Sequence, residues 1–241
     1  MTMQLTLQHL GMSGLRLTLD EDSLCVDPPL PVADDPVLIT WSEAERVSGV
    51  GGAGAVLADP DVLDWLGVSG VPLIPDRPAR FGAFEVAVLP YRPIPYATPR
   101  EALRKTFIGL RRPHVAARRL AHTLSRPAAP PLAVRLDWSG MRIGLCQQAL
   151  HRFVTPAGAD EVRAFFADCH VAIASPDFDD EEACGRMLGA LGARRAVLID
   201  SIGPVRRMLG LPTRALRASM ATAPPGTLLL EDGQRVTLNL A

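Results

Sequence analysis

This sequence of 241 residues has no long apolar run, a single lysine and almost no net charge. A membrane-spanning helix needs about 20 consecutive apolar residues, and no stretch comes near that length. The first ten residues (MTMQLTLQHL) lack the positive segment and apolar core of a secretory leader. A formal net charge of −1 excludes the global positive charge of a general nucleic-acid coat or a polybasic membrane binder. We therefore expect a cytoplasmic protein with no membrane partner and no general affinity for nucleic acid.

Cysteine is also scarce, and the sequence holds no CxxC pair. The four thiols are too few and too widely spaced to cross-link a chain of this length, so we expect all of them to be reduced. They are Cys25, Cys146, Cys169 and Cys184. No period of about 20 to 50 residues recurs, which excludes a solenoid. Apolar residues make up 48% of the chain, which is enough to bury a core and excludes a disordered protein.

The sequence predicts two halves of similar organisation. Each half begins with consecutive strands and continues with strands and helices in alternation. The first half predicts strands at residues 5–7, 15–19, 23–26, 37–40, 54–57 and 84–89, with helices at 42–48 and 60–66. The second half predicts strands at 132–137, 141–146, 171–174, 196–199, 227–230 and 235–240, with helices at 160–166, 181–191 and 204–209. Between them we expect helices within 99–124, broken at Pro113, and a proline-rich connector at 126–131. This order predicts a single domain over residues 1–241, whose two pseudo-symmetric halves are joined through a basic helical insertion at about 98–131.

Several local patterns resemble the metallo-β-lactamase superfamily, and especially its lactonase-like branch of small bacterial hydrolases. A first hairpin containing Gly11 leads to a strand that ends in Asp27-Pro28, as in that branch. A strand ending in Thr40 is followed by the segment from Trp41 to Gly49, where the family has HxHxDH and then a glycine. The resemblance implies the α+β fold class, as a four-layer αβ/βα sandwich, and metal-dependent hydrolysis.

The metal ligands of that family are missing from the matching positions. The ligand positions of HxHxDH fall on Trp41, Glu43, Glu45 and Arg46. The bridging Asp of the family falls on or near Gln148, its final His on Ser201, and its remaining His on Tyr91 or Arg92. The five histidines of this chain lie elsewhere, at positions 9, 114, 122, 151 and 170. The resemblance is therefore to a degenerate member, in which we assign no catalytic residue, no metal ligand and no cofactor.

The substituted side chains are unsuited to a divalent metal. A zinc centre needs three or four imidazole, thiolate or carboxylate donors at about 2.0 to 2.3 Å. Trp41 has no lone pair to donate, and the guanidinium of Arg46 keeps a positive charge where the cations would sit. We expect Arg46 to occupy that space by pairing with Glu43 or Glu45, and the Trp41 ring to fill remaining volume. Without a metal-bound water the family's hydrolytic mechanism has no nucleophile, which predicts a pseudoenzyme.

Three functions remain open on these residues. The first is the binding of an anionic small molecule or a protein partner, with candidate contacts at Asp27, Arg46, Tyr91, Arg92 and Asp200. The second is hydrolysis, with arginine cations in place of metals or with a displaced metal site built from Asp27, Glu43, Glu45 and Asp200. The third is a structural subunit that pairs with an active homologue. Assembly into a homo-oligomer also remains open.

The other patterns favour structural explanations. The segment from Gly49 to Gly54 matches GxGxxG, but a helix precedes it and a strand follows, which predicts a helix stop and not a nucleotide loop. The carboxylates of 177–182 are typical of a first helical turn, with a weak metal site as the alternative. Cys146 and Cys169 are expected to be buried thiols, with an activated thiolate at Cys146 as the alternative. Residues 100–126 hold eight basic side chains against Glu101, which favours a solvated helical face over a surface for an anionic ligand or nucleic acid.

Overall fold

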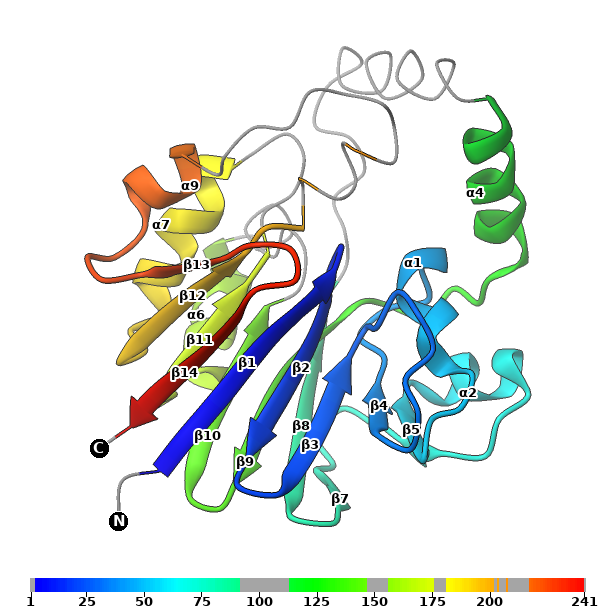
Figure 1. Ribbon diagram of the computed structural model, residues 1–241, viewed down its shortest axis with the longest axis horizontal. Coiled ribbons are helices and arrows are strands. Elements are labelled where there is room, and N and C mark those ends of the chain that lie inside the picture. The colour runs from blue at the N-terminus through cyan, green and yellow to red at the C-terminus, as the bar shows by residue number, and fades with distance from the viewer. Residues whose placement is uncertain are drawn as a thin grey trace.

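Two seven-stranded sheets pack face to face in the computed structural model (Figure 1). The structure describes residues 3–91, 113–146, 156–175, 181–201, 203, 207 and 217–240. In each sheet an antiparallel part is followed by parallel strands, so the two sheets repeat one plan. No helix in these ranges is long and apolar enough to cross a membrane.

The first sheet is built mostly from the N-terminal part of the chain and has the strand order β14-β1-β2-β3-β4-β5-β6. Its strands are β1 (Met3–Gly11), β2 (Gly14–Leu19), β3 (Asp22–Val26), β4 (Pro36–Leu38), β5 (Ala55–Ala58), β6 (Val71–Pro72) and β14 (Arg235–Leu240). Strand β14 comes from the other end of the chain and pairs antiparallel with β1. The two termini of the described chain therefore lie side by side.

The second sheet has the strand order β13-β12-β11-β10-β9-β8-β7. Its strands are β7 (Ala79–Phe81), β8 (Phe84–Pro90), β9 (Leu132–Trp138), β10 (Met141–Cys146), β11 (Val171–Ala174), β12 (Arg195–Ile199) and β13 (Leu228–Leu230). The predicted hairpin is confirmed: β9 and β10 pair antiparallel, and Ser139 and Gly140 between them both have positive φ, at 52° and 82°. Positive φ at both central residues defines the type I′ turn, which matches the twist of a hairpin.

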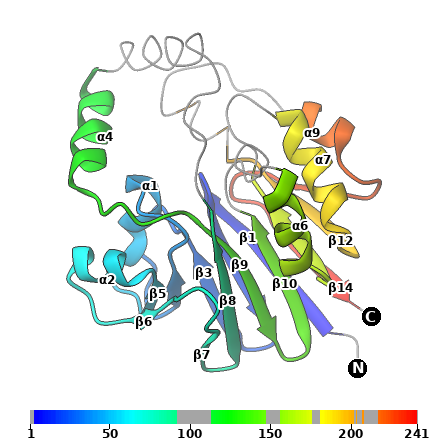
Figure 2. The same ribbon diagram turned by 180° about the vertical axis from the view of Figure 1, so that it is seen from behind.

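Helices cover the outer faces of the two sheets, which gives four layers (Figures 1 and 2). The helices are α1 (Ala44–Val47), the 3-10 turn η1 (Ser48–Val50), α2 (Pro60–Leu66), α4 (Pro113–Ser125), α6 (Pro156–Phe165), α7 (Glu181–Leu191) and α9 (Arg217–Thr222). Val62 and Leu63 of α2 pack on the first sheet, while Cys184 and Leu188 of α7 pack on the second. The architecture is the αβ/βα sandwich that the sequence resemblance implied.

The main core lies between the sheets and follows from the alternation along the strands. Leu5 and Leu7 of β1 are fully buried, whereas Thr6 and Gln8 between and after them are not. From the second sheet, Trp138 enters the same core and meets Phe84 edge to face at 4.3 Å between ring centroids. The expectation that Trp138 is a packing residue is confirmed.

Most predicted elements match the structure, and the misses are short. The helices at 60–66 and 181–191 and the strands at 171–174 and 235–240 have the predicted bounds, and α4 begins at Pro113. Strands β6 and β7 and helix α9 went unpredicted, because they span only two, three and six residues. The strand predicted at 37–40 ends at Leu38. The part of 99–124 before Pro113 lies outside the described residues, as does the helix predicted at 204–209 except for Arg207.

The glycine-rich segment is a helix stop, as expected. Helix α1 and turn η1 precede it, and β5 follows it, so its order is the reverse of a nucleotide-binding loop. Gly52 has a φ of 88°, which glycine adopts without steric cost. A Cβ on Gly49 would overlap the carbonyl oxygen of Pro28 and lie 2.7 Å from that of Leu30. Gly49 therefore lets the turn approach the backbone that follows Asp27.

Candidate functional site

The candidate site lies where strands of both sheets end. Asp27 follows β3, Thr40 follows β4, and Tyr91 follows β8. The proline-rich connector joins them, because the backbone N–H of Leu132 donates to the Thr40 carbonyl and the N–H of Tyr91 donates to the Pro131 carbonyl. Carboxyl ends of parallel strands are the usual place for sites in α/β sheets.

A buried ion pair occupies the middle of this site. Nη1 of Arg46 donates to Oδ2 of Asp27 at 2.5 Å and to Oγ1 of Thr40 at 2.7 Å. Asp27 also accepts hydrogen bonds from the backbone N–H of Thr40 at 2.7 Å and from its hydroxyl at 2.5 Å. Arg46 is 1% exposed and Asp27 is fully buried. The guanidinium therefore lies inside the protein, where it is held by the loops after β3 and β4.

Glu43 completes the neutralisation of Arg46. Its Oε2 lies 3.5 Å from Nε of Arg46, so the pairing expected with Glu43 is present. Burial lowers the pKa of Arg46, but the carboxylates of Asp27 and Glu43 outweigh burial, and the net shift is upward. Burial also raises the pKa of Asp27, while Arg46 and Thr40 oppose that rise. Nη2 of Arg46 is buried and has no hydrogen-bond partner within the described part of the chain.

Trp41 lies at the edge of the site and not at its centre. Its side chain is partly exposed, and the guanidinium carbons of Arg126 and Arg46 lie 4.9 and 6.0 Å from its ring centroid. Nε2 of His122 lies 2.8 Å from the Ser42 carbonyl. The end of α4 and the connector thus hold the loop that carries Trp41. The interior volume we expected the indole to fill is taken by Arg46.

Tyr91 and Cys146 lie in the same region but are unsuited to nucleophilic chemistry. Burial raises the pKa of the Tyr91 phenol far above its ordinary value, although the charge of Arg46 lowers it. Burial likewise raises the pKa of Cys146 well above the ordinary range, and the pKa of Cys169 to about 11. A thiolate is the reactive form of cysteine, so these groups are protonated at neutral pH and behave as buried packing residues.

Of the other predicted site residues, two follow strand β12 and the side chains of the rest lie outside the described part of the chain. Asp200 follows β12, where its Oδ1 accepts a hydrogen bond from the Gly203 N–H at 2.8 Å; Ser201 beside it is buried. Among the described residues, no hydrogen bond or ion pair joins Asp200 to Arg46. Arg92, Gln148 and the side chain of Glu45 lie outside the described residues, as do 177–180 of the acidic cluster.

Two residues that contribute to the site, Thr40 and Arg126, were not predicted as site residues from the sequence. Thr40 was identified only as a strand end, although a hydroxyl there is suited to bridge a carboxylate and a guanidinium. Arg126 was counted only within a basic segment. Its position over Trp41 arises from the path of the connector back to β9, for which the sequence has no local signal.

These side chains do not fit the metal ions that the resemblance implies. Asp27 already accepts three hydrogen bonds, and Glu43 faces Arg46. Trp41 offers no lone pair, and a buried guanidinium repels a divalent cation. Among the described residues no group of three or more His, Cys, Asp or Glu side chains is arranged to hold a metal ion. This donor set supports no metal-dependent step.

The fold defines the chain as a protein with the metallo-β-lactamase fold. No family model matches its sequence, and no curated protein matches it either. Among solved structures it is similar to the metallo-β-lactamase fold protein YhfI from Bacillus subtilis, with a TM-score of 0.62 and 13% identity over 98% of this chain and 99% of that one. At such low identity the likeness establishes the fold alone.

Two further similar structures have different chemistries. Igni18, a metallo hydrolase from the archaeon Ignicoccus hospitalis, matches with a TM-score of 0.61 and 15% identity over 99% of this chain and 100% of that one. CmlA, a diiron β-hydroxylase from Streptomyces venezuelae, matches with a TM-score of 0.62 and 12% identity over 98% of this chain and 54% of that one. Because one fold supports a hydrolase and a hydroxylase, the function of this chain has to be argued from its own site.

Proposed function

We propose that this chain is a metal-free protein of the metallo-β-lactamase fold that acts by binding a small anion and not by metal-dependent hydrolysis. The observation that carries the proposal is the buried pair of Asp27 and Arg46. Arg46 stands on the loop where the resemblance puts the HxHxDH ligands, and Asp27 reaches it from the end of β3. Asp27 and Glu43 neutralise Arg46, so the positive charge that an anion would meet here comes from Arg126 beside Trp41.

The geometry supports an anion at the exposed margin of this pair. Arg126 is partly exposed and makes no ion pair with the described residues, so its guanidinium is available to an oxyanion. Nη2 of Arg46 also has no partner in the described chain, but it is buried, so Arg126 is the accessible donor. Both groups flank Trp41, and guanidinium groups recognise carboxylates and phosphates through paired N–H donors. The ligand class is therefore a small molecule that carries a carboxylate or phosphate.

Metal analysis tests the first half of the proposal. We expect the purified chain, incubated with Zn²⁺ or Mn²⁺ and then desalted, to retain far less than one equivalent of metal by elemental analysis. The reason is that the cluster lacks free donors and already holds a cation. One or two equivalents retained against a competing chelator would overturn the metal-free assignment.

Anion titration tests the second half. We expect citrate to change the tryptophan emission of the chain, and Trp41→Phe to remove most of that response. Arg126→Ala should weaken citrate binding by about tenfold or more, since a charge-assisted hydrogen bond is lost. Arg80→Ala is the matched control, because Arg80 is an exposed arginine on β7 and pairs with Glu85. An unchanged emission with citrate, or equal loss in both arginine variants, would contradict anion binding at this site.

A further inference from the structure

A second concentration of basic groups lies at the other end of the sandwich, where β12 begins and β14 ends. A hollow of about 240 Å³ is lined there by His170, Arg194, Arg195 and Asn239. An adjacent hollow of about 230 Å³ shares Arg195 and Asn239 with it. Asp27 and Arg46 come after the carboxyl ends of β3 and β4, whereas this hollow lies at the amino end of β12. The hollow is therefore separate from the site described above.

The fold, and not the local sequence, brings these groups together. Strands β11 and β12 run parallel with Val171 opposite Arg195. The N–H of Arg195 donates to the His170 carbonyl at 3.0 Å, and the N–H of Arg194 donates to the Cys169 carbonyl at 3.3 Å. Asn239 comes from β14 of the other sheet, one residue before the end of that strand. Three segments distant in sequence thus line one hollow.

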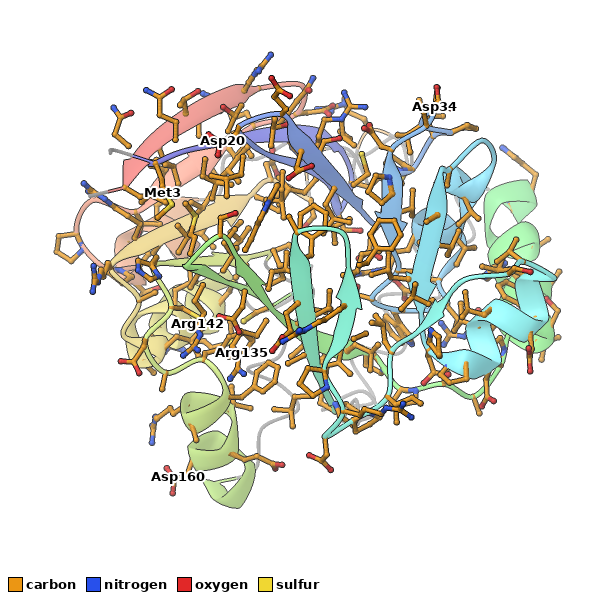
Figure 3. The ribbon with its side chains drawn as sticks, turned by 90° about the horizontal axis from the view of Figure 1, so that it is seen from below. Met3, Asp20, Asp34, Arg135, Arg142 and Asp160 are labelled. Carbon is orange, nitrogen blue, oxygen red and sulfur yellow. The ribbon has the colours of Figure 1, made fainter. Side chains whose placement is uncertain are left out.

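Four of the five lining residues have side-chain hydrogen-bond donors, the fifth is the apolar Leu240, and none of the five is a carboxylate. Nδ1 of His170 accepts the backbone N–H of Arg142 at 3.1 Å, so in the neutral ring the proton lies on Nε2, which is then a donor. Arg194 and Arg195 are exposed and form no ion pair with described residues. On strand β9, Asp137 pairs with Arg142 at 2.9 Å and with Arg135 at 3.5 Å. Figure 3 shows Arg135 and Arg142 side by side at this end.

We propose that this hollow binds a small polyvalent oxyanion such as phosphate. Two guanidinium groups offer forked N–H donors that match the geometry of phosphate oxygens, and Asn239 and His170 add neutral donors. The volume of about 240 Å³ is below the roughly 300 to 1,000 Å³ of pockets that enclose larger ligands. The hollow is open to solvent and does not enclose a ligand, so binding there depends on the exposed donors at its rim.

Calorimetry with inorganic phosphate tests this site separately from the proposed function. The titration is done on the full chain carrying Arg126→Ala, at constant ionic strength, so that the margin of the Trp41 site does not contribute. We expect one equivalent of phosphate to bind, and added Arg194→Ala and Arg195→Ala to weaken that binding at least tenfold. Both side chains are exposed, so the substitutions should leave the fold intact, which the melting temperature checks.

The phosphate experiment has its own control variant and its own outcomes that would overturn the proposal. Arg80→Ala in the same background should bind phosphate as before, because β7 is at the opposite edge of the sheet from β13. Absence of phosphate binding in the Arg126→Ala chain would overturn this site, and so would binding that survives the loss of both Arg194 and Arg195. Neither result bears on the citrate response at Trp41, so the two proposals fail independently.

Discussion

Replacing Arg46 with alanine is expected to destabilise the fold by about 3–5 kcal/mol, because it leaves the carboxylate of Asp27 buried without its cation. Domains of this kind are stable by only about 5–15 kcal/mol, so the loss is a large fraction of the total. Urea denaturation followed by circular dichroism measures it as a lower midpoint. Arg46→Lys should lose less, because it keeps the charge and loses only the forked geometry.

The double variant Asp27→Asn with Arg46→Met separates the ion pair from simple packing. It removes both charges and keeps comparable volume, and we expect it to be more stable than Arg46→Ala or Arg46→Met alone. Exchange of a whole buried pair for uncharged groups is often close to neutral. Asparagine also tolerates the positive φ of 45° at position 27. If Arg46→Ala unfolds at the same urea concentration as the unaltered chain, the pair does not organise this site.

Gly49→Ala is expected to cost about 1–3 kcal/mol, or more where the backbone cannot shift. The added methyl group would overlap the carbonyl oxygen of Pro28 and approach that of Leu30. Both contacts are with backbone, which cannot rotate away as a side chain can. Since Pro28 follows Asp27, the strain should also weaken the citrate response at Trp41. Thermal and urea unfolding measure the first effect, and tryptophan emission the second.

Gly51→Ala is the matched control two residues away. Its φ of −61° suits any residue, and a Cβ there would meet only the Pro31 ring, at 3.9 Å. Such a substitution restricts the unfolded chain, so stability should be unchanged or higher by about 0.4–1 kcal/mol. Equal losses in the two variants would mean that general flexibility of the glycine segment matters, and not the close approach at Gly49.

Some elements of this fold could be predicted from the pattern of their own residues. Alternation identified β1 and β14 because one face of each strand is buried and the other is not. Helix α2 was predicted with correct bounds, since Asp59 caps it, Pro60 opens it and Gly67 ends it in a left-handed conformation. Strands β6 and β7 were not predicted, because two or three residues are too few to show an alternation of apolar and polar side chains. They exist through pairing with β5 and β8.

The sequence by itself determined that Trp41 and Arg46 are not metal ligands, because an indole and a guanidinium offer a metal no lone pair whatever their surroundings. It also determined the order of strands and helices that the resemblance to the fold rests on. Only the tertiary structure decided that Arg46 is buried against Asp27, that Arg126 lies over Trp41, and that Arg194, Arg195 and Asn239 line one hollow. The physical reason is that these partners lie on different strands and loops, and sheet pairing, not neighbouring sequence, sets the distances between them.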